Sequence, residues 1–218
     1  MKTFLAEFLG TSALVFAGTG AIIADHVSGG AVGNTGIGLV FGLVVMAMIC
    51  VFGGKSGAHL NPAVTWALAL AGRFPWRGVP VYLAAQFAGA FAASGLYHFL
   101  FPNDPTLGAT LPSVGAGQAF VLETVLTGML VFTILAVAGK DGGLQAAAIG
   151  AVVGLEAMFA GPFTGASMNP ARSLAPAIVS GNFQFLWLYP ISAFLGAALA
   201  VPLWSLLGKG ESPPVFVR

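Results

Sequence analysis

"SGAHLNPAVT" (56–65) and "TGASMNPARS" (164–173) are two versions of one ten-residue segment within a chain of 218 residues. Both contain Gly-Ala, then two variable residues, then Asn-Pro-Ala, and the two Asn residues lie 169 − 61 = 108 positions apart. Asn is a preferred residue just before a helix, and Pro is preferred at its first position. Each segment therefore predicts the start of a helix, at Pro62 and at Pro170.

The composition around these segments is that of a membrane protein. Hydrophobic residues make up 57% of the chain and charged residues only 7%, and the mean hydropathy is +0.92. Soluble domains carry about 25% charged residues. Lipid is therefore the expected solvent. The net charge of +1 argues against a nucleic-acid partner.

Six segments are long and apolar enough to cross a bilayer, which takes about 20 residues in a helix. Two further apolar segments, 62–71 and 170–179, are only about 15 Å long as helices, half of a ~30 Å hydrocarbon core. We therefore expect one all-α transmembrane domain over 1–218, with six spanning helices and two half-helices. The expected spans are 4–24, 35–52, 79–101, 118–138, 144–160 and 183–207.

Basic residues orient this arrangement, because Lys and Arg accumulate on the cytoplasmic side of membrane proteins. The loops 25–34 and 102–117 contain no Lys or Arg. Both termini are therefore expected to be cytoplasmic, and Arg172 is the one basic residue that does not follow the rule. The others fall on one side: Lys2, Lys55, Arg73, Arg77, Lys140, Lys209 and Arg218.

Three spans separate the two half-helices, so the second must enter the membrane from the side opposite to the first. The segments around Glu7 ("EFLGTSALVF") and Glu123 ("ETVLTGMLVF") also match each other. We therefore expect an inverted repeat, roughly 1–101 and 116–208. Two half-helices that meet at the midplane would bring together two side-chain amides and two irregular segments with free carbonyl groups, which describes a polar pore for uncharged molecules.

In this arrangement the sequence resembles the aquaporin, or major intrinsic protein, family, and the match covers essentially the whole chain. The resemblance implies a passive channel in which both Asn-Pro-Ala segments meet in the pore, and in which Arg172 belongs to an outer selectivity filter. It implies water and small neutral solutes as partners, a lipid bilayer, a homotetramer, and no cofactor or metal. The pore motifs are Asn61, Pro62, Ala63, Asn169, Pro170 and Ala171.

The resemblance also places the other filter positions, at Phe41, Ala157 and Ala166. Water-selective members usually have His at the position of Ala157, whereas glycerol-conducting members usually have small residues there. The filter is therefore expected to be wide, which favours water plus glycerol, urea or metalloid hydroxides such as boric, silicic or arsenous acid. The second motif is similar to the nodulin-like branch, and Ser173 departs from the Asp that is usual in the glycerol branch. A water-selective aquaporin is the alternative.

Acidic residues within the spans have two interpretations. Glu7 and Glu123 could relay protons, but their repetition favours a structural role, in which each accepts hydrogen bonds from the re-entrant segment of its own repeat. Glu156 has no equivalent in the family that the sequence resembles, and it could face a pore wall, a neighbouring subunit or the outer end of its span. In the outer loops, His26 could gate with pH, although a solvated loop residue is the more common case.

Two other function classes compete with a channel. Inverted repeats with broken helices also build ion- or proton-coupled secondary transporters, but these need a titrating or ion-binding group in the pathway, whereas the central groups here are amides. An enzyme is the weakest hypothesis, since the sequence offers no catalytic cluster. A bacterial inner membrane is the expected location, and small residues such as Gly89 and Gly196 are expected to permit close packing between subunits.

Overall fold

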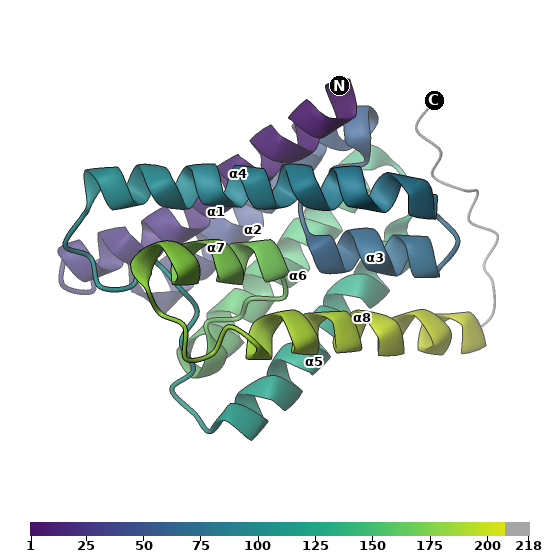
Figure 1. Ribbon diagram of the computed structural model, residues 1–218. Helices are drawn as coiled ribbons and strands as arrows, with labels where there is room; N and C mark the ends of the chain where they lie inside the picture. Colours follow the sequence, from purple (N-terminus) through teal and green to yellow (C-terminus); the bar gives the residue numbers. More distant parts are fainter. Residues whose placement is uncertain (208–218) are drawn as a thin grey trace.

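The computed structural model describes residues 1–207, and these residues are almost entirely helical (Figure 1). Six helices are long and apolar enough to cross a membrane, which confirms the expected fold class of six spans with two half-helices. The long helices are α1 (Lys2–Val27), α2 (Gly33–Ser56), α4 (Val79–Leu100), α5 (Ala116–Val137), α6 (Gly142–Thr164) and α8 (Leu188–Leu206). The short ones are α3 (Pro62–Leu70), the single turn η1 (Trp76–Gly78) and α7 (Pro170–Ser180).

The half-helices α3 and α7 lie in one row between α4 and α8 (Figure 1). Each starts as the sequence predicts, because the Asn side chain caps the first turn. The Oδ1 of Asn61 accepts from the N–H of Ala63 at 2.9 Å, and that of Asn169 accepts from Ala171 at 3.0 Å. Proline follows each Asn, where no backbone donor is needed.

Three spans extend further than the sequence predicts, since α1 continues to Val27, α2 to Ser56 and α6 to Thr164. Within α6, Pro162 cannot donate to the carbonyl of Met158, which would normally end the helix. The side-chain amide of Asn34, at the start of α2, donates to that carbonyl instead. A donor from another helix therefore replaces the one that the proline lacks, and α6 continues to Thr164.

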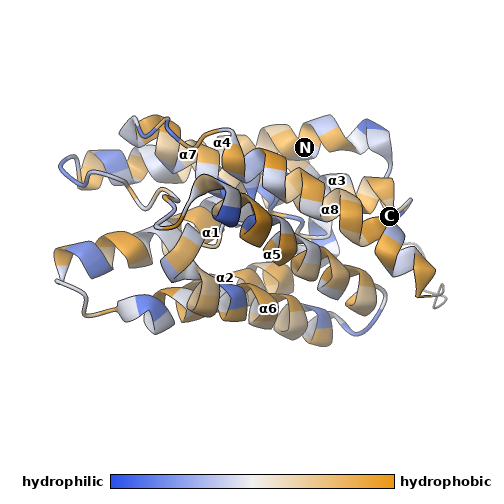
Figure 2. Ribbon diagram, turned by 90° about the horizontal axis from the view of Figure 1, so that it is seen from below, coloured by the Kyte–Doolittle hydropathy of each residue, from blue (hydrophilic) through white to orange (hydrophobic). Residues whose placement is uncertain are grey.

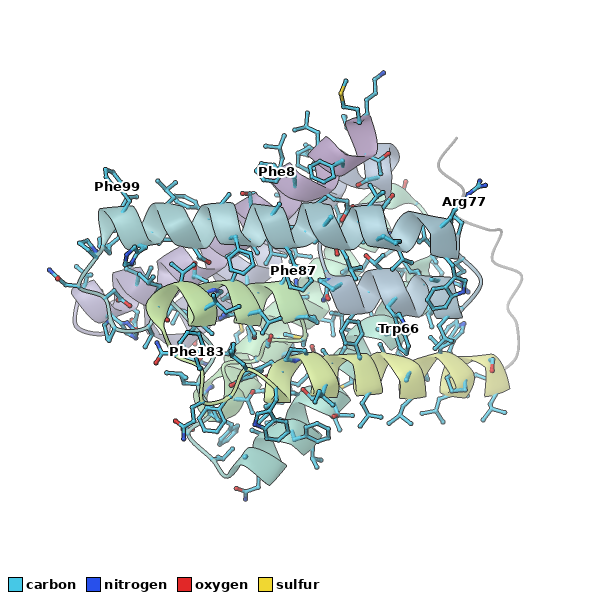
Figure 3. All side chains as sticks on the ribbon, viewed as in Figure 1. Phe8, Trp66, Arg77, Phe87, Phe99 and Phe183 are labelled. Carbon is cyan, nitrogen blue, oxygen red and sulfur yellow. The ribbon has the colours of Figure 1, made fainter. Side chains whose placement is uncertain are left out.

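The last span was predicted to begin at residue 183, but α8 begins at Leu188. Residues 184–187 form turns, in which the N–H of Leu186 donates to the carbonyl of Phe183 at 3.2 Å. Phe183 and Trp187 are 60% and 51% exposed, and Phe183 lies at the end of the molecule marked by Phe99 (Figure 3). This apolar run is aromatic, as is typical of the membrane–water interface rather than of a spanning helix.

Glycines allow α2 and α6 to cross at close range. A Cβ on Gly42 would lie only 2.7 Å from the carbonyl oxygen of Gly150, and one on Gly38 only 3.0 Å from that of Gly154. The two matched Gly-x-x-x-Gly pairs therefore pack against each other, one from each half of the chain. This crossing places Phe41 of α2 beside the residues of α6 that face the centre of the molecule.

Other small residues pack inside the chain, which corrects one expectation. Gly89 of α4 lies against the backbone of Phe8 in α1, and Gly196 of α8 lies against the backbone of Thr124 in α5. Both glycines are buried within the single chain. They bring pairs of helices of one subunit together, so they do not form the contact between subunits.

The surface is that expected of a protein in lipid. Apolar residues run along the helices, and hydrophilic ones gather at the helix ends and in the loops (Figure 2). Many large apolar side chains point outward, such as Leu43 and Leu155, which are 54% and 56% exposed. Arg77 lies at the end of α4 opposite to Phe99 (Figure 3).

Candidate functional site

The site is built on two re-entrant segments, 57–60 and 165–168, which precede the half-helices. Both contain two non-glycine residues with positive φ, at 47° and 52° for Ala58 and Leu60 and at 41° and 54° for Ala166 and Met168. Such conformations are uncommon for side chains of this kind and persist only where the surroundings hold them. The matching angles show that both halves need the same backbone shape.

Glu7 holds the first segment in this shape. It is fully buried, and each of its two carboxylate oxygens accepts two hydrogen bonds. Its Oε1 accepts from the hydroxyl of Ser56 at 2.6 Å and from the N–H of His59 at 3.0 Å. Its Oε2 accepts from the N–H of Leu60 and from the side-chain amide of Gln86, both at 2.8 Å.

Glu123 makes the corresponding contacts in the second segment. Its carboxylate accepts from the hydroxyl of Thr164 at 2.7 Å and from the N–H groups of Ser167 and Met168 at 2.9 and 3.0 Å. In both segments the backbone N–H groups therefore point at a buried carboxylate. The carbonyl groups of these residues do not bond to the carboxylates, which can only accept hydrogen bonds.

The tips of the two half-helices are tied to each other at the centre. The amide nitrogen of Asn61 donates to the carbonyl of Met168 at 2.8 Å, and that of Asn169 donates to the carbonyl of Leu60 at 2.9 Å. An amide nitrogen carries two hydrogens, so each Asn keeps one donor beyond this bond. The two Asn side chains thus have fixed positions, and each has one donor that no other described residue accepts.

A cavity of about 540 Å³ runs past these two side chains. Phe41, Ala157, Ala166 and Arg172, the four residues expected to form the filter, all line it together with Asn61 and Asn169. The remaining motif residues are buried in the packing of α3 and α7 and are not among the described residues that line the cavity: Pro62, Ala63, Pro170 and Ala171.

Arg172 is the fixed charge of the cavity, and it is only 1% exposed. One guanidinium nitrogen, Nη1, donates to the carbonyl of Gly108 at 2.9 Å, and the Cζ atom lies 5.0 Å from the centre of the Phe41 ring. The other two nitrogens, Nε and Nη2, have no partner within the described residues. They are donors that a hydroxyl or carbonyl group of a passing solute can use.

Two parts of the site could not be predicted from the sequence. Gly108, in the loop between α4 and α5, gives no signal of its contact with Arg172. The other part is the mouth opposite the filter, where Arg73, Phe74 and Arg77 line the cavity. Arg73 is held there by a hydrogen bond of 2.9 Å to the carbonyl of Leu135. Only the basic and aromatic run "GRFPWR" could have indicated this mouth.

Glu156 differs from the other two acids of the spans. It is fully buried, and neither carboxylate oxygen has a partner within the described residues. It does not line the cavity, and its burial excludes contact with a second subunit. Gly154 faces α2 and Ala157 faces the cavity, so the helical rotation of 100° per residue directs Glu156 to the remaining side, toward α5.

Replacing Glu156 by methionine should therefore keep or raise the stability of the protein. A buried polar group without partners is costly, and an apolar side chain of similar shape removes that cost. We expect the Glu156→Met variant to melt in detergent at the same temperature as the native protein or higher, and to conduct water at the native rate. A clear loss of stability would mean that Glu156 has a partner that the described contacts do not include.

Comparisons with known proteins agree with this geometry. The family model described as Major intrinsic protein matches residues 1–204. Over 211 residues the chain is 46% identical to Aquaporin NIP1-4 of Oryza sativa subsp. japonica, covering 95% of this chain and 77% of that one. Over 209 residues it is 42% identical to Aquaporin NIP6-1 of Arabidopsis thaliana, covering 94% and 68%.

A solved structure is similar over nearly the whole fold. The X-ray structure of the aquaglyceroporin from Plasmodium falciparum matches with a TM-score of 0.83 at 30% identity, covering 94% of this chain and 98% of that one. The two relatives above are plant proteins, so they give no support to the expected bacterial inner membrane. The extent of the family match and the identity to these relatives lead to one conclusion: the chain is a multi-pass membrane protein of the major intrinsic protein family, the family of the aquaporins.

Proposed function

We propose that this protein is a passive membrane channel for water and small uncharged solutes, such as glycerol, urea and the metalloid hydroxides boric, silicic and arsenous acid. Ions and protons are excluded, and the protein catalyses no reaction. The observation that carries the proposal is a single cavity that runs past Asn61 and Asn169 and reaches Arg172. All the polar groups that a solute meets at these positions are fixed by other contacts of the chain.

The chemistry of this cavity favours uncharged molecules with hydroxyl or carbonyl groups. A solute can accept hydrogen bonds from the second amide hydrogens of Asn61 and Asn169 and from Nε and Nη2 of Arg172, which have no partner among the described residues. The re-entrant segments, which line the same cavity, offer carbonyl acceptors. A cation would meet the positive charge of Arg172 and the positive ends of two helix dipoles, each equivalent to about half a charge. An anion would lose its hydration shell in a cavity lined largely by apolar residues.

The filter composition favours a wide channel over a water-selective one. Phe41, Ala157 and Ala166 contribute no hydrogen-bonding side chain, and two of them are small. Small apolar residues leave room for a three-carbon polyol and do not retain water by hydrogen bonds. The similar solved structure is that of an aquaglyceroporin, and this name, like the NIP names of the two plant relatives, supports the same class of solute.

A secondary transporter is the competing class, and one feature of the site speaks against it. Coupled transport needs a titrating or ion-binding group in the pathway. The groups at the centre are two amides, and the carboxylates of Glu7 and Glu123 are occupied by hydrogen bonds from the backbone. Among the described residues no Asp or Glu lines the cavity, and the histidine that does, His59, has its Nδ1 atom 3.1 Å from the hydroxyl of Thr65.

Swelling of liposomes tests this proposal directly. Purified protein in liposomes should accelerate the entry of water, glycerol and boric acid above that of empty liposomes, and should leave the entry of sodium and the decay of a proton gradient unchanged. Glycerol should reach the same final concentration on both sides of the membrane with and without a pH difference. Accumulation of a solute against its gradient, driven by pH, would instead establish a coupled transporter.

The proposal also covers the domain organisation, the orientation in the membrane and the oligomeric state. The whole chain is one channel domain, with repeats of roughly 1–101 and 116–208, the last residue of which lies outside the described part. The cytoplasmic face carries Lys2, Lys55, Arg73, Arg77 and Lys140, so the chain begins on that side and α8 ends there; Lys209 and Arg218 also lie outside the described residues. Subunits form a homotetramer with one pore each, as the family resemblance implies, through the apolar outer faces of the helices.

A further inference from the structure

The loop between α4 and α5 is fixed at the mouth of the filter. Gly108 has a φ of +72° and lies directly against Thr19 of α1, where any side chain would collide. The preceding residue, Leu107, is 1% exposed and packs with Ile23 and Tyr97. The carbonyl of Gly108 is the group that accepts from Arg172, so the position of this loop decides where the filter arginine is held.

Asp104 organises the turn that leads into this contact. Its Oδ1 accepts from the N–H groups of Thr106 and Leu107, at 3.0 and 2.7 Å. Its Oδ2 lies 3.3 Å from Nδ1 of His26, the residue near the end of α1. The Asp104 side chain is 5% exposed, whereas the His26 side chain is 44% exposed and meets solvent. One carboxylate therefore connects the end of α1 to the residues just before Gly108.

We propose that His26 and Asp104 are positioning residues for the selectivity filter: their contact fixes the loop that presents the Gly108 carbonyl to Arg172. The inference rests on the proposed channel function. With the loop in place, Nη1 is held by the carbonyl and the guanidinium stays at the wall beside Phe41. When the loop loosens, Arg172 loses that acceptor and turns toward the lumen, which narrows the passage for glycerol more than for water.

The charge of Asp104 fixes the direction of any pH effect on the contact between pH 8 and pH 5.5. Partial burial would raise the pKa of Asp104, but hydrogen bonds from Thr106 and Leu107 and the contact with His26 outweigh this and leave its pKa below the usual 3.8. Asp104 therefore stays charged throughout this range. Next to this fixed negative charge, a positive charge at position 26 would strengthen the hold on the loop, and histidine is the residue type that can gain one near neutral pH.

Few other charges lie near this pair. Asp25 precedes His26 on α1, but its carboxylate accepts from the N–H groups of Val32 and Gly33. From α4, Tyr97 packs against Leu107, and His98 lies exposed in the last turn. The loops 25–34 and 102–117 contain no Lys or Arg. His26 is thus the one basic group that contacts Asp104 among the described residues.

The test is the ratio of glycerol to water permeability in liposomes, with the same pH on both sides. Asp104→Asn keeps an acceptor for the turn but removes the charge, and His26→Gln keeps a polar side chain. Asp25→Asn is the matched control, because it removes a neighbouring charge that does not touch the loop. His26→Lys restores a positive charge at every pH used.

We expect the native ratio to rise on the order of twofold between pH 8 and pH 5.5, which is the range of effects that exposed ion pairs produce. Asp104→Asn and His26→Gln should have a low ratio without pH dependence, His26→Lys should have the high ratio at both pH values, and Asp25→Asn should behave as the native protein does.

Three results would overturn the inference while leaving the channel function intact: a native ratio that does not change with pH, a pH dependence that survives in Asp104→Asn, or an effect of Asp25→Asn as large as that of Asp104→Asn. If Asp104→Asn fails to fold, the exposed His26 variants decide alone, and equal ratios in His26→Gln and His26→Lys would refute the proposal. Absence of any solute flux in the native protein would instead refute the channel function itself.

Discussion

The Ala157→His variant is expected to admit glycerol about tenfold more slowly than the native protein or slower still, a factor that corresponds to only about 1.4 kcal/mol of added barrier. Ala157 lines the cavity together with Phe41 and Arg172, and an imidazole ring in its place would fill space that the methyl group leaves open. The ring would also add a hydrogen-bonding group that suits water. Water permeability should therefore fall much less than glycerol permeability.

Two further substitutions at the same position separate size from polarity. Ala157→Ser adds a hydroxyl group with little volume and should keep glycerol entry near the native rate, whereas Ala157→Val adds volume without polarity and should slow glycerol. Stopped-flow light scattering of liposomes with equal protein content gives both rates from one preparation. Unchanged glycerol entry in Ala157→His would show that the filter lies elsewhere along the cavity.

Replacing Glu123 by methionine is expected to prevent the channel from folding. The substitution leaves three buried donors without an acceptor: the hydroxyl of Thr164 and the N–H groups of Ser167 and Met168. Each such group costs about 1–3 kcal/mol, and together they amount to a large part of the roughly 5–15 kcal/mol that stabilises a typical protein. The backbone around Ala166 and Met168, with its positive φ angles, would then lose the carboxylate that holds the N–H groups of Ser167 and Met168.

The matched control is Glu156→Met, in the neighbouring helix. Both acids are fully buried, but only Glu123 accepts hydrogen bonds from the described part of the chain. We expect the Glu123→Met protein to elute as aggregate in size-exclusion chromatography, and the Glu156→Met protein to elute and melt as the native one does. Glu123→Gln keeps one acceptor and should lose less stability than Glu123→Met. Equal behaviour of the two methionine variants would contradict the role given to Glu123.

The sequence indicated the fold because lipid imposes simple requirements on a chain. Spans must be about 20 apolar residues long, so their number could be counted directly. The half-helices at Pro62 and Pro170 were identified because Asn and Pro mark a helix start through local bonds alone. The span ends were harder to predict, since a proline such as Pro162 suggests a helix end, whereas α6 continues to Thr164 and the amide of Asn34, from another helix, takes the place of the missing donor.

The candidate site, like the fold, has parts that the sequence predicts and parts that it does not. Glu7 and Glu123 could be paired with the re-entrant segments from their repetition, and the filter positions followed from the family resemblance. Glu156 could not be interpreted from the sequence, because its meaning depends on which neighbours it has, and the described residues give it none that could bond to it. Gly108 was missed altogether, since one more glycine in a loop carries no local signal of a contact with Arg172.

The sequence by itself determined the membrane environment, the number of spans, the two helix starts and the repeat, because each of these depends on local composition or on bonds within a few residues. The tertiary structure alone decided how the strained re-entrant backbone is held, which groups of Arg172 remain free, and how the outer loop reaches the filter. These depend on bonds between residues far apart in the chain, such as Asp104 with His26 and Gly108 with Arg172. The position of each partner is fixed only when all the helices have packed.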